Sequence, residues 1–390
     1  MPFKLFSTPP LFLFCILASS AHITAEFIPS ITPVPGQPFS SGINGISTSY
    51  SPDGKFFATA IPQGIRVFSV ALDGALTVTQ GSPFYSGYAI GDLAYSPNGY
   101  FLTAIRDTTE LVTFSVNTIT GALTHIGAPI TIDDSSPQKI AYSPNGKFLA
   151  SINTDSSPTQ ASIVIFVINS DGTLGTQTYY ALDADYNGIS ISYAPDGKFL
   201  AISEYNNQAD IQTIKNIPFN SATGILDTAN TQSISYSSPI SSNITYAPSG
   251  EYIAEGFIDG ARLYKVNRKT GILTLQSTSI LPNEAAGFAV TFSPDSNFLV
   301  AANSLGTKIY VLQISADGQL IQYGNPLIAS QPASSLSFSP LFTAGNAYFS
   351  WTNITGISDL EGKISSYTFN LSPAMGPLAS AIRNKYLFNK

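Results

Sequence analysis

Apolar runs separated by short turns rich in Pro, Asp, Asn and Gly recur along the chain. One unit reads aromatic-Ser-Pro-Asp-Gly-Lys-Phe-Leu-Ala, and close variants begin at Tyr50, Tyr95, Tyr142, Tyr193, Tyr246 and Phe292, with a degenerate copy from Phe338. The prolines of the seven copies lie at positions 52, 97, 144, 195, 248, 294 and 340. Successive prolines are therefore 45 to 53 residues apart. A sequence period of this length indicates a repeat architecture.

The unit predicts a hairpin. Pro followed by Asp or Asn and then Gly favours a type I turn in which the Gly takes a positive φ. An apolar run precedes each turn and another follows it; a third run such as IRVFSV leads to a second turn, for example Asp73-Gly74, and to a fourth strand. Four strands and two tight turns in about 47 residues match one antiparallel propeller blade. The strands are almost continuously apolar, as expected where both faces of a blade pack against neighbours.

The seven copies predict an all-β, seven-bladed β-propeller of four-stranded antiparallel blades. Residues 31–39 resemble the last strand of a blade, and the final repeat ends soon after residue 370. We therefore expect the N-terminal strand to complete the seventh blade and close the ring. The expected organisation is a propeller over 26–373 and a C-terminal tail over 374–390.

Residues 1–25 have the layout of a secretory signal peptide. Lys4 precedes an apolar stretch at 11–18, and small residues offer cleavage near Ala21 or Ala25. The stretch is shorter than the roughly 20 residues that span a bilayer. An uncleaved anchor or a buried strand remains the alternative. The expected location is secreted, periplasmic or cell-surface.

Composition excludes several classes of function. Only 11% of residues are charged and the net charge is −7, which argues against nucleic-acid binding. Two His and one Cys cannot supply a Cys/His zinc site or a disulfide framework. The sequence predicts no cofactor, no metal site and no stable membrane span, and we expect a monomer.

The repeat SPDGKFLA, followed by V-x-F-x-V and TGALT, resembles the lactonase-type seven-bladed propellers, a group near the phosphogluconolactonases and surface-layer propeller repeats. It is more distantly similar to WD-repeat proteins, although their Trp-Asp and Gly-His pairs are absent. The resemblance covers essentially the whole mature chain and implies a propeller fold. Enzymes of this group place His, Arg and Glu near the central channel, and such a cluster has no match here residue by residue.

The loops that differ between blades are expected on one face of the ring, which we call the variable-loop face. The repeated Pro-Asp-Gly and Thr/Asp-Gly turns are expected on the other, the turn face. Most acids fall on the variable-loop face, with Arg106 and Lys139 as its clear cations. An acidic rim would concentrate cations or basic peptides, although acids that merely solubilise the loops are the simpler alternative. The binding candidates are Asp92, Asp107, Glu110, Asp133, Asp134, Asp155, Asp183, Asp185, Glu204, Glu255 and Glu284.

Catalytic candidates are few. Arg106 with Glu204, Glu255 or Glu284 could form an acid/base cluster at the channel mouth, with exposed salt bridges as the simpler outcome. His125 is expected in an outer strand as a structural residue. The sequence therefore favours an exported binding or interaction module with a protein, peptide or small cationic ligand as partner. A lactonase-like hydrolase and a structural surface-display protein remain the alternatives.

Overall fold

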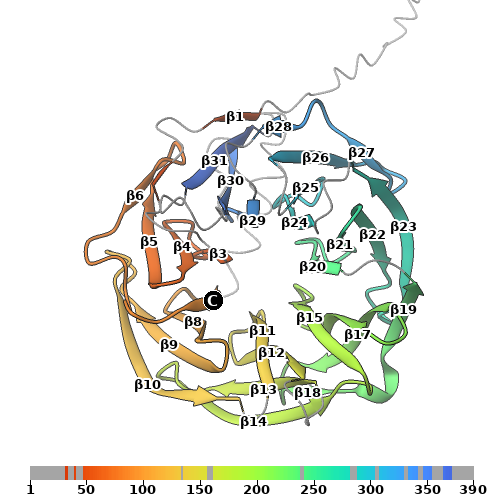
Figure 1. Cartoon of the computed structure of the whole chain (residues 1–390), viewed down its shortest axis with the longest axis horizontal. Coiled ribbons are helices and arrows are strands. Elements are labelled where there is room, and N and C mark those ends of the chain that lie inside the picture. The colour runs from red at the N-terminus through yellow and green to blue at the C-terminus, as the bar shows by residue number, and fades with distance from the viewer. Residues whose placement is uncertain are drawn as a thin grey trace, which may run out of the picture.

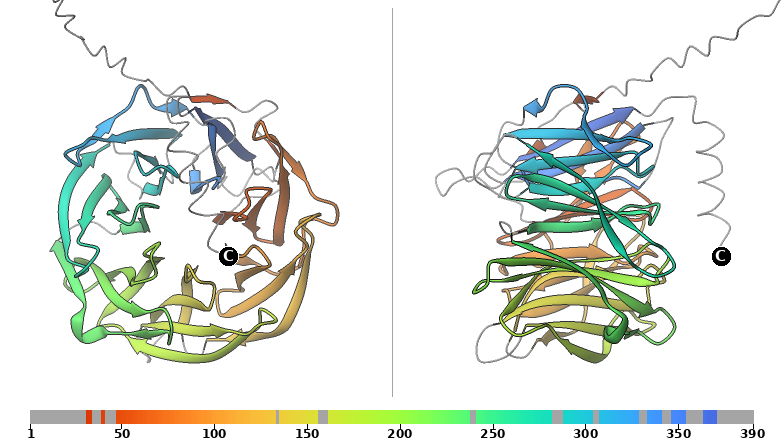
Figure 2. Two further views of the ribbon diagram at one scale, coloured as in Figure 1. Left: turned by 180° about the vertical axis from the view of Figure 1, so that it is seen from behind. Right: turned by 90° about the vertical axis from the view of Figure 1, so that its right-hand side faces the viewer.

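The computed structural model describes residues 31–33, 39–40, 47–132, 135–155, 161–237, 241–281, 288–303, 307–328, 333–340, 346–353 and 363–370. These residues form an all-β propeller whose sheets are arranged around a common centre (Figure 1). Seen from the side, the sheets form a disc (Figure 2). The signal-peptide prediction, the C-terminal tail and residues Asp133, Asp134 and Glu284 lie outside the described residues. Within them, no helix is long and apolar enough to cross a membrane.

Six complete blades are built from consecutive antiparallel strands. Blade 1 consists of β3 (Ser47–Tyr50), β4 (Phe56–Ile61), β5 (Gly64–Val70) and β6 (Leu76–Val78). Blade 2 consists of β7 (Ile90–Tyr95), β8 (Phe101–Arg106), β9 (Glu110–Val116) and β10 (Leu123–Thr131). Blade 3 consists of β11 (Ser135–Tyr142), β12 (Phe148–Asp155), β13 (Ser162–Ile168) and β14 (Leu174–Ala181).

The next three blades follow the same order, with an interrupted outer strand in blades 4 and 6. Blade 4 consists of β15 (Tyr186–Tyr193), β16 (Phe199–Asn206), β17 (Ile211–Asn220), β18 (Ile225–Leu226), a 3₁₀ turn at Thr228–Asn230 and β19 (Gln232–Ser237). Blade 5 consists of β20 (Ser241–Tyr246), β21 (Tyr252–Phe257), β22 (Gly260–Val266) and β23 (Leu273–Ile280). Blade 6 consists of β24 (Phe288–Phe292), β25 (Phe298–Asn303), β26 (Lys308–Ile314), β27 (Leu320–Gln322) and β28 (Leu327–Ile328).

The count of six complete blades differs from the seven predicted from the prolines, because the last repeat supplies only three strands of its own. These are β29 (Ala333–Phe338), β30 (Asn346–Asn353) and β31 (Lys363–Asn370). With two N-terminal strands they form an antiparallel sheet in the order β1-β31-β30-β29, in which β1 (Ile31–Pro33) and β2 (Phe39–Ser40) both pair with β31. The two ends of the described chain therefore meet in one sheet.

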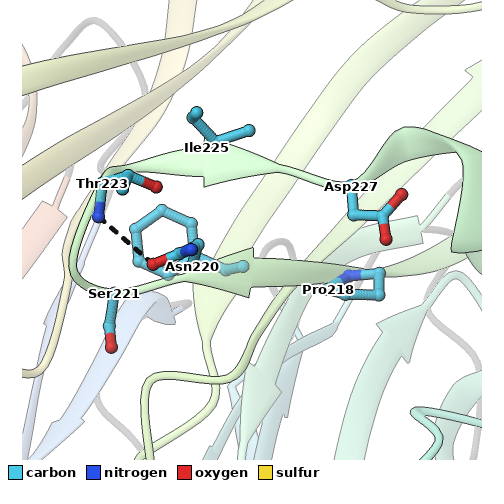
Figure 3. Close-up of a pocket in the computed structure, with 7 residues that line it drawn as sticks. Pro218, Asn220, Ser221, Thr223, Ile225 and Asp227 are labelled. Atoms are coloured by element: carbon cyan, nitrogen blue, oxygen red, sulfur yellow. Dashed lines mark hydrogen bonds between the residues drawn. The ribbon is translucent and has the colours of Figure 1, made fainter.

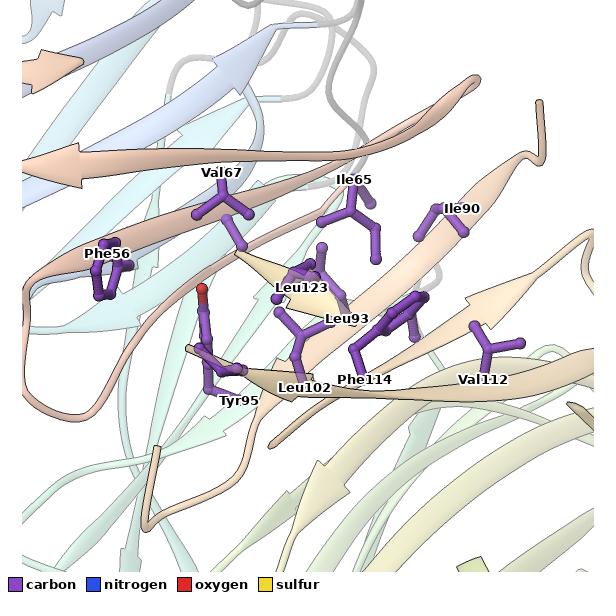
Figure 4. Packing of buried hydrophobic residues seen from close by; sticks show 14 residues of the cluster. Phe56, Ile65, Val67, Ile90, Leu93, Tyr95, Leu102, Val112, Phe114 and Leu123 are labelled. Carbon is purple, nitrogen blue, oxygen red and sulfur yellow. The ribbon is translucent and has the colours of Figure 1, made fainter. Parts of the chain in front are cut away.

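Most of the hydrophobic core that the structure describes lies between adjacent blades. Between blades 1 and 2, Phe56 and Val67 pack against Leu102 and Phe114 (Figure 4). Along β4 every residue is buried, as expected for a strand that packs on both faces, whereas the outer strand β14 is mostly exposed. Since each blade supplies half of two interfaces, burial of apolar surface stabilises the ring as a whole.

The Pro-Asp-Gly turns are built as predicted and connect the first two strands of each blade. In blade 3, the Ser143 hydroxyl accepts a hydrogen bond from the Phe148 amide at 3.0 Å and donates one to Asn145 Oδ1 at 2.8 Å. Gly146 has a φ of +70°. The same Ser-centred pattern recurs at Ser51, Ser96 and Ser293.

The second turn of blades 2 to 5 explains why the repeat needs both a Gly and a Phe. Gly172 in blade 3 has a φ of +85°, and a Cβ there would overlap the ring of Phe101 in blade 2. Gly121, Gly224 and Gly271 meet the equivalent Phe of the preceding blade in the same way. The turns therefore join neighbouring blades as well as strands.

Candidate functional site

The variable-loop face carries several clusters of charged side chains, each built within one blade or between neighbours. In blade 2, Arg106 ends β8 and Glu110 begins β9, so the short turn places them side by side. Arg106 Nε lies 2.5 Å from Glu110 Oε2, and Arg106 Nη1 donates to the Tyr85 hydroxyl at 2.6 Å. Tyr85 belongs to the connection from blade 1. Arg106 thus ties two blades together.

Aromatic rings surround this arginine. The Arg106 guanidinium carbon lies 4.7 Å from the ring centre of Tyr88, whose ring stacks on Tyr85. Tyr85 also stacks on His125 at a centroid distance of 5.2 Å. Burial, together with the positive charge of Arg106, lowers the pKa of His125. His125 lies in β10, the outer strand of blade 2, as predicted, and its contacts are packing contacts.

The cluster in blade 4 combines a buried and an exposed carboxylate on one lysine. Lys215 Nζ lies 2.6 Å from Glu204 Oε1 and 2.7 Å from Asp183 Oδ2. The Glu204 side chain is fully buried, whereas that of Asp183 is 70% exposed. Burial raises the pKa of Glu204, and the charge of Lys215 opposes that rise. Lys215 therefore forms ion pairs with two acids, one buried and one exposed.

The cluster in blade 5 is the most enclosed. Glu255 is fully buried in β21 and lies opposite Arg262 in β22, whose Nη1 is 3.3 Å from Glu255 Oε2. Tyr264 donates to Glu255 at 2.7 Å, and Tyr236, from the outer strand of blade 4, donates to its other oxygen. Burial raises the pKa of both tyrosines, so their hydroxyls remain donors. The Arg262 guanidinium also lies over the ring of Phe257, with its carbon 3.9 Å from the ring centre.

Nearer the centre of the ring, Asp92 joins three innermost strands. It accepts hydrogen bonds from the Ser47 hydroxyl at 2.6 Å, the Lys139 ammonium at 3.0 Å and the Ile140 amide at 3.0 Å. These partners come from β3 and β11, on either side of β7. These three hydrogen-bond donors to Asp92 therefore come from the innermost strands of the two neighbouring blades.

The structure does not assemble the predicted acid/base cluster from its described members. Arg106 pairs with Glu110, Glu204 with Lys215, and Glu255 with Arg262. The other candidates are distributed along the same face. Asp107 lies 3.9 Å from Arg106, Asp185 accepts from Gln208, and Asp155 ends β12, its side chain lying outside the description. No group of three His, Cys, Asp or Glu in the described part of the chain is placed to hold a metal ion.

Two cations lie near the variable-loop face that the sequence did not predict there. Lys215 and Arg262 both lie near the variable-loop face, where only Arg106 and Lys139 were expected. Arg262 could have been placed from its cross-strand register. Residues opposite each other in an antiparallel pair lie on the same side of the sheet and at the same height along the strands, and therefore near the same face of the ring. Glu255 and Arg262 are such a pair across the two-residue turn at 258–259.

A surface depression lies elsewhere, at the hairpin between β17 and β18 on the turn face. It is lined by Pro218, Phe219, Asn220, Ser221, Thr223, Ile225 and Asp227 (Figure 3). Asn220 Oδ1 accepts a hydrogen bond from the Thr223 amide at 3.2 Å, which shapes the turn. Asp227 is its one ionisable lining residue. The depression therefore reflects the extended hairpin of blade 4 and is separate from the charged clusters.

No family model matches the chain, and no curated protein matches its sequence. Among solved structures, the β-propeller domain of Myceliophteria thermophila Cps50 (Swd1) is similar with a TM-score of 0.58 and 14% identity, covering 82% of this chain and 96% of that one. A putative 6-phosphogluconolactonase from Bacteroides uniformis has a TM-score of 0.59 and 18% identity over 77% and 91% of the two chains. A chain of the Mitotic Checkpoint Complex has a TM-score of 0.56 and 13% identity over 94% and 97%. At these identities the similarity establishes the β-propeller fold alone.

Proposed function

We propose that the protein is an exported interaction module that binds a basic peptide or another cationic partner through its variable-loop face. The observation that supports this most is the edge of blade 4, where Asp183, Asp185 and Asp210 are all exposed. The cation Lys215 is shared with the buried Glu204. This edge offers an excess of negative charge to a partner.

The three carboxylates are held in place by neighbouring donors. Lys215 contacts Asp183, Gln208 Nε2 donates to Asp185 at 3.1 Å, and the Tyr205 hydroxyl donates to Asp210 at 2.5 Å. Asp185 and Asp210 also take left-handed backbone conformations, with φ of +67° and +55°. Because the acids are fixed before binding, a partner would lose less free energy in ordering them.

We further propose that the N-terminal segment directs export and that the two ends of the chain close the ring. The layout of residues 1–25 supports export. We also propose that the sheet containing β1 and β29–β31 acts as the seventh blade and closes the ring, with the propeller over 26–373. The pairing of Ile31 with Phe369 supports this, because it joins the first described strand to the last.

The test compares two triple variants that change the same charge on opposite faces. Asp183→Asn, Asp185→Asn and Asp210→Asn together should weaken binding of a fluorescent oligolysine peptide about tenfold in an anisotropy titration, since three exposed charges contribute roughly 0.5 kcal/mol each. Asn tolerates the left-handed conformation at positions 185 and 210.

The control carries Asp53→Asn, Asp196→Asn and Asp295→Asn on the turn face, where Asn98 and Asn145 already occupy the equivalent turn position. It should bind as the wild type does. Equal weakening in both triple variants would show that only net charge matters, and it would contradict a site on the variable-loop face.

A further inference from the structure

An arginine in blade 1 occupies the same ladder position as Arg262 in blade 5 but lacks its partner. Arg66 in β5 lies opposite Thr59 in β4, as Arg262 in β22 lies opposite Glu255 in β21. In both blades the arginine is the third residue of its strand. The two sites therefore differ mainly in what faces the guanidinium, a buried carboxylate in blade 5 and a buried hydroxyl in blade 1.

Arg66 is partly buried without a compensating acid. Its Nε is shielded from solvent and has no hydrogen-bond partner among the described residues, and no described carboxylate lies within ion-pair distance. Burial lowers the pKa of Arg66, in the direction expected for a desolvated cation. Removing a guanidinium from water without an anion or an acceptor is unfavourable.

Two threonines share a cross-strand row with Arg66. Thr48 in β3 lies opposite Thr59, so Thr48, Thr59 and Arg66 form one row on a single face of the blade. That face is turned toward β29, because Thr48 Oγ1 lies 3.0 Å from Ser335 Oγ. We call the group of Thr48, Thr59, Arg66 and Ser335 the Arg66 niche. Hydroxyl donors beside a guanidinium are a suitable environment for an oxyanion.

We propose that the Arg66 niche binds a ligand carrying a carboxylate, and that this carboxylate takes the place that Glu255 occupies beside Arg262. The planar guanidinium matches a carboxylate in a bidentate arrangement. The Thr59 hydroxyl, which donates to the Ala60 carbonyl at 3.4 Å, would turn to donate to a remaining lone pair. The proposal is independent of the cationic partner proposed for blade 4, since it concerns a different blade and a ligand of opposite charge.

The test uses acetate and succinate as probes on the whole protein at constant ionic strength, with chloride as the reference anion. Acetate should shift the Arg66 Nε–H resonance in a saturable way and raise the Tm. A ligand at ten times its Kd lowers the unfolding constant about elevenfold. A larger effect of succinate than of acetate would identify a dicarboxylate as the better ligand.

The decisive variant is Thr59→Glu, which supplies the carboxylate from within the chain as blade 5 does. It should raise the Tm in chloride and abolish the response to acetate. Arg66→Gln should abolish the response as well, while Arg268→Gln, which removes an exposed arginine on the turn face, should leave it unchanged.

Two results would overturn the proposal. A response to acetate that persists in both Thr59→Glu and Arg66→Gln would place carboxylate binding elsewhere. A wild-type protein that shows no response to acetate or succinate would show that Arg66 binds no carboxylate.

Discussion

The two faces of the propeller are built from the same strands, but one is nearly identical from blade to blade and the other varies. On the turn face, the Ser-centred hydrogen bonds at Ser51, Ser96, Ser143 and Ser293 repeat with little change. On the variable-loop face, blades 2, 4 and 5 carry three different ion-pair clusters centred on Arg106, Lys215 and Arg262. Repetition at one edge therefore fixes the architecture, while the other edge is free to differ from blade to blade.

The difference extends to burial. Acids of the turn face, such as Asp196, keep part of their surface in water and pair with exposed cations. Glu204 and Glu255 near the variable-loop face are fully buried. A buried carboxylate depends on its partners far more than an exposed one does. The comparison predicts that equal changes of charge will have unequal effects on the two faces.

The largest effect is expected for Glu255→Ala. It leaves Arg262 without its carboxylate and removes the acceptor used by Tyr236 and Tyr264. Breaking one side of a buried pair should lower the free energy of unfolding by about 4 kcal/mol. Urea denaturation followed by tryptophan fluorescence and circular dichroism measures the change.

The matched control is Asp196→Asn on the turn face. Asn can keep the hydrogen bond from the Lys198 amide, so only the partly exposed pairs with Lys198 and Arg268 are lost. The expected cost is below about 1 kcal/mol. Similar losses in the two variants would mean that the buried cluster in blade 5 contributes no more than a surface pair.

A second prediction tests whether the turn face joins blades through its glycines. Gly172→Ala should lower the free energy of unfolding by about 3 kcal/mol, because a positive φ disfavours Ala and its Cβ would overlap Phe101. Gly324→Ala is the control, since Gly324 has a φ of +66° with nothing within 4 Å of the added Cβ. Thermal unfolding should show a distinctly smaller loss for the control.

If Gly172→Ala and Gly324→Ala lower the free energy of unfolding equally, backbone strain alone accounts for the loss in both variants. The contact between the turn of blade 3 and Phe101 would then contribute nothing to the joining of blades 2 and 3.

The sequence predicted the blades well because their signals are local. The spacing of Pro52, Pro97 and Pro144 located the first turns, and each Gly two residues later takes the predicted positive φ. The sheet that contains both β1 and β31 is different, since these two strands are separated by almost the whole chain. The sequence suggested that pairing only through the resemblance of residues 31–39 to other outer strands, and the six blades of consecutive strands are one fewer than expected.

The candidate site was predicted less well because its contacts depend on register and on neighbouring blades. Arg106, Glu204 and Glu255 each pair within their own blade and do not meet one another. Tyr236 could not be assigned to Glu255 from the sequence, because it comes from the outer strand of blade 4. Local patterns define strands and turns, whereas partners across an interface require the packed ring.

The smallest expected effect is a difference in pH dependence between the faces. Burial raises the pKa of Glu204, so in the folded state it holds a proton at pH values where the unfolded chain, with a pKa of about 4.3, has lost it. The contribution of Glu204 to stability therefore falls as pH rises through that window. Attraction to Lys215 limits the size of the change.

Asp171 on the turn face should behave in the opposite way. Hydrogen bonds from the Thr173 hydroxyl and amide lower the pKa of Asp171, so its contribution is present above the unfolded pKa of about 3.9 and is lost as pH falls. Tm is measured from pH 3.5 to 7. The Tm of Glu204→Gln relative to that of the wild type should increase as pH rises, while the relative Tm of Asp171→Asn should decrease. Parallel profiles would contradict the idea that the two faces hold their acids in different environments, because burial and hydrogen bonding shift a carboxyl pKa in opposite directions.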